Sequence, residues 1–345
     1  MPRGQGNLLD TGVRIESFDP KADQERLHRC YEIWTATRRL DAPDLPRRSF
    51  ATFTVRWTHG WGGDPRQAWI ASDDAGEPVG CYLLTLPERE NVTMAICALT
   101  VTPARRRAGF GTELLAHCVQ QARLTGRTRL VAEATDGSAG AAFAAAVGAT
   151  SGMTELLRVL KVDSGLRSKL PSLRAQAESH AAGYTLLSWL GACPENRIDD
   201  VARISGAMAD APRDEGTDPE LWDADRIRAA ETAGIANGWR YHAVAAQHDA
   251  TGELAALTQL GTDPGVPGWG FQSLTAVLPA HRGHRLGLLT KVAMLQWLPE
   301  FDSDVSRILT GNAGPNDHMI AINEQLGFEV CSEERNWELD LTATP

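Results

Sequence analysis

The chain has 345 residues, more than one ordinary hydrophobic core accommodates, so we expect two domains. An apolar content of 43% and a charged content of 23% are typical of a globular protein, and no run of residues is long and apolar enough to span a bilayer. The net charge of -10 argues against nucleic-acid binding, which depends on a basic surface.

The first part of the chain predicts alternating strands and helices that end near residue 162. Period-2 patterns indicate strands and a hairpin, and apolar residues at a spacing of three and four indicate amphipathic helices. In chain order these are a strand at 13–18, helices at 22–40 and 47–58, a hairpin at 68–86, a strand at 94–101, a helix at 111–126, a strand at 129–135, a helix at 139–149 and a strand at 154–162.

The last part of the chain predicts the same elements in the same order. They are a strand at 184–191, helices at 195–208 and 221–235, a hairpin at 241–260, a strand at 270–277, a helix at 288–298, a strand at 307–312, a helix at 316–327 and a strand at 336–342. A polar stretch between the two parts indicates a linker with some helical character.

A register shift of 176 positions relates the two parts. Val101 and Pro103 recur as Val277 and Pro279, and the same shift relates three further pairs, namely Arg106 to Arg282, Gly111 to Gly287, and Gly76-Glu77 to Gly252-Glu253. Several matches in one register, with the same order of elements, indicate two copies of one domain.

We therefore predict an α/β fold of the α+β type with a mixed sheet in each of two tandem domains. The first copy spans residues 1–162, the linker 163–182, and the second copy 183–345.

The segment RRRAGFGTELL of the first copy combines positive charge with glycines at the start of a helix. Gly109 and Gly111 precede or open the helix, and Arg105 to Arg107 add three positive charges. The first amides of a helix lack partners and carry the positive end of its dipole, and glycine lets an anion approach them closely. The pattern predicts a pyrophosphate cradle. No GK[ST] follows and GxGxxG is absent, so neither a Walker loop nor a dinucleotide fingerprint is indicated.

The pattern V-x-P-x-x-R-x-x-G-x-G between a strand and a helix resembles the acyl-coenzyme A loop of the GNAT N-acetyltransferase superfamily. The first copy matches at Arg106, Gly109 and Gly111, and the second copy at Arg282 and Gly287, whereas Arg285 replaces the middle glycine. The later segment NDHMIAINEQLGF is similar to the family's second motif. A tandem chain with this order of elements is also similar in architecture to the mycothiol synthases.

The resemblance implies two acyl-CoA-binding domains, acetyl-CoA as cofactor, and direct attack of an amine on the thioester. In the first copy it places the cofactor beside Leu99, Val101, Arg106, Arg107, Ala108, Gly109, Phe110, Gly111 and Thr112. In the second copy the corresponding residues are Leu274, Thr275, Val277, Arg282, Gly283, His284, Arg285, Leu286, Gly287 and Leu288, together with Asn312 and Asn316. Arg285 can still donate its amide in the loop if its φ stays negative, and its guanidinium can reach a phosphate.

Neither copy has the tyrosine that this family often uses as an acid. Ala144 stands at that place in the first copy and Asn323 in the second, and an amide cannot protonate a thiolate as a phenol does. A water molecule or another side chain must then act, or the thiolate leaves unassisted. Because the later motif of the second copy is polar, we expect catalysis there, with Asn323 and Gln272 as the candidate catalytic residues. Glu133 is an alternative base in the first copy.

The leading hypothesis is an acetyl-CoA-dependent N-acetyltransferase that acts on a small-molecule amine, as a monomer or homodimer. A non-catalytic acyl-CoA sensor or scaffold is the alternative, and a nucleotide-binding protein is a third.

The six cysteines form no CxxC pair, and the start has no apolar signal core, so we expect a reducing cytoplasm, no metal site and no membrane partner.

Overall fold

The computed structural model describes residues 12–60, 63–210, 212–313 and 316–342. The first copy contains β1 (Arg14–Phe18), α1 (Gln24–Asp41), α2 (Phe50–Thr58), β2 (Arg66–Ser72), β3 (Pro78–Thr85), β4 (Met94–Val101), α3 (Phe110–Leu124), β5 (Arg129–Thr135), α4 (Ala139–Ala146) and β6 (Thr150–Lys161). The second contains β7 (Tyr184–Leu190), α6 (Ile198–Gly206), α7 (Ala224–Ala236), β8 (Arg240–His248), β9 (Leu254–Thr262), β10 (Trp269–Val277), α8 (Leu286–Trp297), β11 (Arg307–Ala313), α9 (Asp317–Leu326) and β12 (Glu329–Asp340). The predicted order of elements and the mixed α/β class are confirmed.

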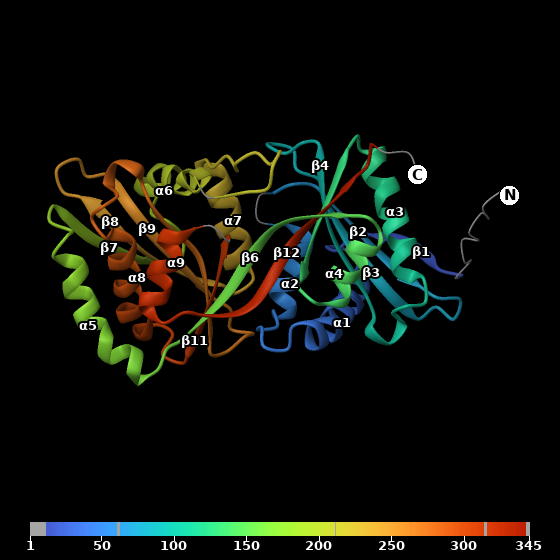
Figure 1. Ribbon diagram of the computed structural model, residues 1–345, viewed down its shortest axis with the longest axis horizontal. Coiled ribbons are helices and arrows are strands. Elements are labelled where there is room, and N and C mark those ends of the chain that lie inside the picture. The colour runs from blue at the N-terminus through green and yellow to red at the C-terminus, as the bar shows by residue number, and fades with distance from the viewer. Residues whose placement is uncertain (1–11, 61–62, 211, 314–315, 343–345) are drawn as a thin grey trace.

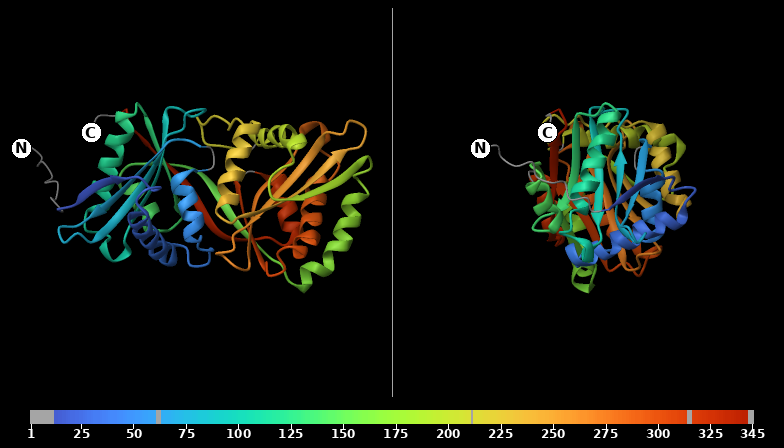
Figure 2. Two further views of the ribbon diagram at one scale, coloured as in Figure 1. Left: turned by 180° about the vertical axis from the view of Figure 1, so that it is seen from behind. Right: turned by 90° about the vertical axis from the view of Figure 1, so that its right-hand side faces the viewer.

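One mixed sheet runs through both copies, with helices on both of its faces (Figures 1 and 2). Alternate residues of a strand point to opposite faces, so each copy has two cores. Along β3, Tyr82 and Leu84 pack with α3, whereas Cys81 and Leu83 pack with α1 and α2. The second copy repeats this arrangement, with α8 covering one face and α6 and α7 the other.

The last strand of each copy lies in the sheet of the other copy. The strand order is β1-β2-β3-β4-β5-β12-β6-β11-β10-β9-β8-β7, so β12 pairs with β5 and β6 pairs with β11. The two exchanged strands also pair with each other and cross the middle of the molecule (Figure 1). As a result, the C-terminal strand ends beside α3, where Arg123 Nε donates to Leu341 O at 3.0 Å.

The segment between the copies is mostly helical. Helix α5 (Ser164–Glu178) is capped by Asp163, whose side chain accepts a hydrogen bond from Leu166 N. Leu166, Leu170 and Ala177 are buried in the core that contains α8. This packing makes the segment part of the second copy's outer layer. Within the described ranges, no helix has both the length and the apolar character needed to cross a membrane.

Two glutamates face each other where the exchanged strands meet. Glu155 of β6 lies opposite Glu334 of β12, and Glu334 pairs with Arg38 at 3.2 Å. Burial, together with the nearby carboxylates of Glu133 and Glu334, raises the pKa of Glu155 to about 7. A carboxyl group in this setting is more easily protonated in the folded chain than in the unfolded chain.

We expect Glu155→Gln to stabilise the protein at pH 8 and to change its stability little at pH 5. Since the folded-state pKa is raised, stability falls as the pH rises from the unfolded value to about 7, and the variant removes this loss. The expected gain at pH 8 is on the order of 1 to 3 kcal/mol. Urea unfolding at both pH values measures it, with the exposed Glu329→Gln as control. An equal effect of the two substitutions at pH 8 would contradict this account.

Candidate functional site

The two predicted loops have matching backbones. In the first copy a short 3-10 turn (Pro103–Arg105) leads to Arg106 in an extended conformation, with φ -66° and ψ 157°. In the second copy the turn Pro279–His281 leads to Arg282, with φ -70° and ψ 160°. The next helix, α3 or α8, begins four residues after each arginine. The internal repeat read from the sequence therefore corresponds to a repeated local structure.

Each loop contains two residues in the left-handed region, one arginine and one glycine. In the first copy they are Arg107, with φ 65°, and Gly109, with φ 91°. In the second copy they are Gly283, with φ 87°, and Arg285, with φ 55°. The condition of a negative φ at Arg285 is therefore not met. The tight turn before α8 requires the left-handed conformation, which a non-glycine residue adopts at a cost of about 1–2 kcal/mol.

The helix starts bring the predicted cofactor residues together in each copy. The first turn of α3 contains Phe110, Gly111 and Thr112, and that of α8 contains Leu286, Gly287 and Leu288. Thr112 N already donates to Gly109 O at 2.9 Å. The amides of the first two residues of each helix have no partner within it, so they can bind an anion. A Cβ on Gly111 would lie 3.6 Å from Phe143, and one on Gly287 would lie 3.2 Å from Ile322. A larger residue would crowd both helix starts.

Two of the three arginines in the first loop are engaged in ion pairs. Arg106 forms a two-bond pair with Asp41 at the end of α1, at 2.9 and 2.7 Å, and Arg105 pairs with Asp73. Arg107 and Ala108 are exposed beside the start of α3. Arg106 thus fastens the loop to α1, and Arg107 lies free of that contact for an incoming phosphate.

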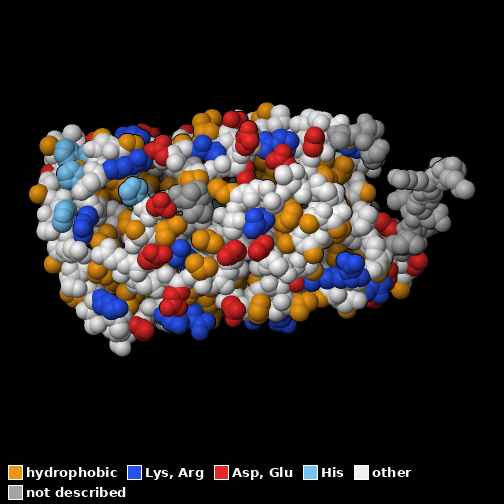
Figure 3. Space-filling model, viewed as in Figure 1, with side chains coloured by type: hydrophobic (Ala, Val, Ile, Leu, Met, Phe, Trp, Pro, Cys, Tyr) orange, Lys and Arg blue, Asp and Glu red, His pale blue; other side chains and the backbone are white. Residues whose placement is uncertain are grey.

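Histidines surround the second loop. His281 is buried, with Nδ1 2.9 Å from the Tyr184 hydroxyl and Nε2 3.0 Å from Glu253. His284 is exposed, and its Nδ1 lies 3.1 Å from His180 O. Histidine side chains gather at this end of the molecule (Figure 3). Arg282 pairs at 2.7 Å with Asp210, and both side chains are more than half exposed.

The strands that lead to the loops separate from their parallel neighbours. β4 pairs with β5 only from Met94 to Ile96, and β10 pairs with β11 only from Trp269 to Phe271. Leu99 and Val101 in the first copy lie beyond these pairings, and so do their counterparts Thr275 and Val277 in the second copy, together with Leu274. The backbone of each strand therefore borders a gap that ends at the loop.

Only the second of the two separating strands contains a bulge. The pairing of β10 with β9 shifts between Gln272 and Leu274, whereas β4 pairs with β3 without a shift. Gln272 Nε2 donates to Thr258 Oγ1 and to Gln259 O, both at 2.8 Å. A bulge leaves backbone groups unpaired in the ladder and turns them away from it.

A chain of buried polar side chains lies beside this bulge. Lys291 Nζ of α8 donates to Asn323 Oδ1 at 2.9 Å and lies 3.5 Å from Gln272 Oε1. Asn323 Nδ2 in turn donates to Asn312 Oδ1 at 2.7 Å. Asn323 is 0% exposed, Lys291 2% and Asn312 8%. The structure thus brings together Gln272, Asn323 and Asn312, while Asn316 caps α9 by accepting from Met319 N.

Sequence reasoning missed Lys291. It lies in the apolar helix segment LLTKVAMLQWL, and it is one of four lysines in a chain that contains 34 lysines and arginines together. Burial lowers the pKa of its ammonium group to about 7. The sequence does contain a feature that could have identified it, namely a lysine at a core position of an otherwise apolar helix. The 176-position shift relates Lys291 to Leu115, so the first copy has no equivalent amine.

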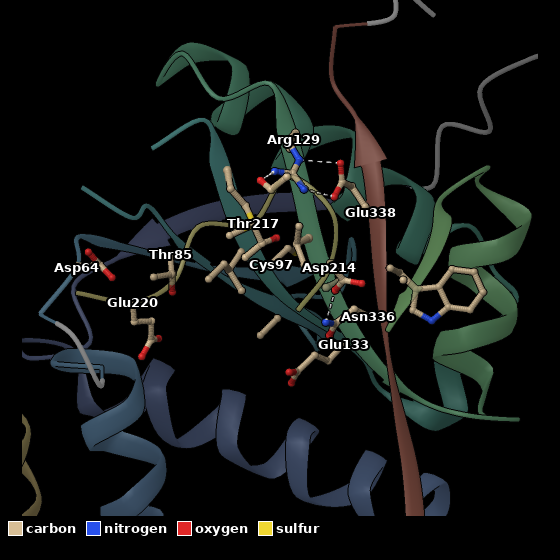
Figure 4. Close-up of a pocket in the computed structure, with 18 of the residues that line it drawn as sticks. Asp64, Thr85, Cys97, Arg129, Glu133, Asp214, Thr217, Glu220, Asn336 and Glu338 are labelled. Atoms are coloured by element: carbon tan, nitrogen blue, oxygen red, sulfur yellow. Dashed lines mark hydrogen bonds and ion pairs between the residues drawn. The ribbon is translucent and has the colours of Figure 1, made fainter. Parts of the chain in front are cut away.

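A cavity of about 1170 Å³ adjoins the separating strands of the first copy (Figure 4). Its walls come from β4, β5 and β12 and from residues 214–222 of the second copy. The charged lining residues are Asp64, Glu133, Asp214, Glu215, Glu220, Glu338, Asp340, Arg56, Arg66, Arg129 and Arg226. Arg129 pairs with Glu338 at 2.6 Å, and Arg226 pairs with Glu90 at 2.6 Å. With these two arginines neutralised, the lining has an excess of negative charge, which suits a cationic ligand.

Hydrogen bonds hold the segment 214–222 over this cavity. Asn91 exchanges two hydrogen bonds with the backbone of Asp218, at 2.7 and 3.0 Å. Asp214 accepts from Asn336 Nδ2 at 2.6 Å, as Figure 4 shows, and Arg129 donates to Gly216 O. The connection between α6 and α7 thus covers the site of the other copy.

The reverse arrangement occurs at the second copy. A cavity of about 410 Å³ lies against Trp269 and Arg307, the first residues of β10 and β11, and residues 43–48 of the first copy line it. Each copy therefore covers the strand ends of the other with the connection between its first two helices. In the part of the chain that the structure describes, no group of three or more His, Cys, Asp and Glu side chains could hold a metal ion.

Comparisons with known proteins agree with this geometry. The model of the acetyltransferase (GNAT) family matches residues 27–148, which contain the first loop and the helix α4. A search of curated proteins finds no match.

The fold is similar to those of solved acetyltransferases. A tandem GNAT protein from the clavulanic acid biosynthesis pathway is 26% identical, with a TM-score of 0.81 over 96% of this chain and 100% of its own. A GCN5-related N-acetyltransferase from Sphaerobacter thermophilus is 14% identical, with a TM-score of 0.66 over 96% and 97% of the two chains. A putative acetyltransferase from Pyrococcus horikoshii is also 14% identical, with a TM-score of 0.56 over 98% and 92%. At 14% identity the likeness concerns the fold alone.

We expect Arg285→Val to lower the free energy of unfolding by about 1 to 2 kcal/mol, because β-branched residues are strained in the left-handed conformation. In Arg285→Gly the relief of strain is offset by the larger conformational entropy of glycine in the unfolded chain, so stability should change little. Urea unfolding measures both, with Arg282→Val, at a negative φ, as the control. If the two valine variants were equally stable, the backbone of Arg285 would not be the constraint.

Proposed function

We propose that this chain, which belongs to the GNAT acetyltransferase superfamily and carries two copies of its domain, transfers the acetyl group of acetyl-CoA to a primary amine of a small molecule. We place the reaction in the second copy. The observation that carries this choice is the polar set beside the bulge of β10, formed by Gln272, Lys291, Asn323 and Asn312.

The first copy has apolar side chains at two of the corresponding positions. Leu115 replaces Lys291 and Ala144 replaces Asn323. A group that forms or loses charge during a reaction needs hydrogen-bond partners, and these two side chains supply none. We propose that the first copy binds acetyl-CoA without being the main site of turnover.

The residues of both loops fit the pyrophosphate of acetyl-CoA. Each loop has a glycine within the first helical turn, two left-handed residues before it and unpaired amides, and each adds exposed basic side chains. We propose that Arg107 in the first copy and Arg282 and Arg285 in the second pair with phosphate oxygens. Acetyl-CoA supplies an acyl group activated as a thioester.

Roles for the second copy's residues follow from their contacts. Gln272 holds the bulge through Thr258 and Gln259 O, so that backbone amides of this segment can polarise a carbonyl group. Asn323 orients the buried amine of Lys291. The amine acceptor enters from the side of the 410 Å³ cavity, whose size suits a small molecule.

Turnover in the first copy is the second candidate, and the larger, acid-lined cavity favours it. Glu133 lies on β5 in the lining of that cavity and could accept the proton of an amine (Figure 4). The two candidates differ in which loop the reaction needs.

Ala108→Asp and His284→Asp form a matched pair, since both positions are exposed and the 176-position shift relates them. A carboxylate here repels phosphate at one loop only. We expect calorimetry to find two acetyl-CoA sites in the wild type and one in each variant. CoA release with a panel of primary amines, followed with a thiol reagent, should fall at least about tenfold in His284→Asp and little in Ala108→Asp.

Ala108→Ser and His284→Ser serve as controls, because they keep the loops uncharged. The opposite pattern of activities would move the reaction to the first copy. Binding of acetyl-CoA to both loops without CoA release from any amine would favour the sensor or scaffold. Absence of acetyl-CoA binding would contradict the proposed function as a whole.

A further inference from the structure

Lys291 occupies an unusual position for a lysine. It is 98% removed from solvent, on a helix whose neighbouring residues form the apolar core of the second copy. It lies one helical turn after Gly287, so it follows the loop on the same face of α8. A buried ammonium group is costly unless it is hydrogen-bonded, so a lysine here needs a reason.

The contacts of Lys291 hold its amine beside the residue at the place of the missing tyrosine. Asn323 stands there, and its Oδ1 accepts from Lys291 Nζ at 2.9 Å. An asparagine is shorter than a tyrosine and has no acidic proton to give, whereas the lysine bonded to it from α8 does have one. Together, Asn323 and Lys291 supply a proton donor on the side of the sheet where a tyrosine would supply it.

We propose that Lys291 protonates the sulfur of CoA as it leaves in the second copy. This inference rests on the proposed function. In the step, the C–S bond of the thioester breaks as the new C–N bond forms, and the sulfur takes a proton from the Nζ ammonium. The acceptor amine releases a proton to solvent, and the neutral Lys291 amine takes up a proton from solvent. Protons and charge therefore balance.

The groups around Lys291 suit this role. Asn323, Gln272 and the ring of Phe328, 5.0 Å from Nζ, are all neutral. Helix α8 packs against α5, β8, β9 and β10, and β9 and β10 carry no charged residue. The charged and titratable residues of the other two are Arg167, Lys169, Arg174 and Glu178 of α5, and Arg240, Tyr241, His242 and His248 of β8; Arg174 pairs with Glu178, and Arg240 and His242 pair with Asp302. Glu300 follows α8, Arg307 lies on β11, and Asp317, His318 and Glu324 lie on α9, where Glu324 pairs with Arg158. Burial is the cause that lowers the pKa of Lys291. A donor that titrates near neutrality gives its proton to a thiolate more readily than an ordinary lysine does.

The first test does not depend on turnover. In the Ala108→Asp background, which confines CoA to the second loop, absorbance at 240 nm reports ionisation of the bound CoA thiol. Lys291 loses its proton near pH 7, before the thiol ionises, so the thiol of bound CoA should titrate alike in the parent and in Lys291→Met. Lys291→Arg keeps its charge at every pH, so there the thiol should titrate at lower pH if position 291 faces the sulfur. An unshifted thiol titration in Lys291→Arg would overturn the proposal.

The second test separates proton donation from charge. With acetyl-CoA and an active amine, we expect the rate in the parent protein to fall as the pH rises through the pKa of Lys291, because the acid must be protonated. Both Lys291→Met and Lys291→Arg should lower kcat about 100-fold and lose this fall, with the KM for acetyl-CoA changed only a few-fold. Full activity of Lys291→Arg would show that charge alone matters and would overturn proton donation.

Controls make failure of this inference distinct from failure of the proposed function. Lys169→Met changes an exposed lysine and should behave as the parent in both tests. Thermal unfolding and acetyl-CoA calorimetry confirm that each Lys291 variant is folded and binds. A parent protein that releases no CoA with any amine contradicts the proposed function. A parent that turns over as fast as Lys291→Met contradicts only the role of Lys291.

Discussion

The structure depends on the exchange of two strands between the copies. A sheet edge exposes unpaired backbone groups, which must find partners or meet water. Here β12 completes the sheet of the first copy and β6 that of the second, and the two pair with each other. Neither copy has a complete sheet without the other, so the whole chain is one folding unit even though its sequence consists of two repeats.

This exchange also explains why each of the two cavities is lined by both copies. The exchanged strands bring the helical faces of the copies together, and β12 forms part of the wall of the first cavity. The connection between α6 and α7 then lies over the first copy's strands, and residues 43–48 lie over the second copy's. A change in either connection therefore acts on the other copy.

The two copies differ where chemistry would take place. The loops have kept the same backbone conformation, and the glycine and the arginine have only changed places between the left-handed positions. Beside the gap between the strands, by contrast, the first copy has Leu115 where the second has Lys291. The first copy's β4 is regular, whereas the second copy's β10 contains a bulge. Binding an anion requires mainly backbone geometry, whereas proton transfer requires particular side chains. These differences favour acetyl-CoA binding by both copies and catalysis mainly in one of them.

Much of this protein can be predicted from its sequence alone, because the features concerned are local. Periodicity predicts the helices and strands, and the glycines and arginines beside Pro103 and Pro279 predict two anion-binding loops at helix starts. The left-handed φ of Arg285 and the ion pair of Arg106 with Asp41 could not be predicted, because packing against distant elements decides them. The exchange of β6 and β12 could not be predicted either, because their sequence patterns are compatible with either sheet. The contact of Lys291 with Asn323 joins residues 32 positions apart, and only tertiary structure brings them together.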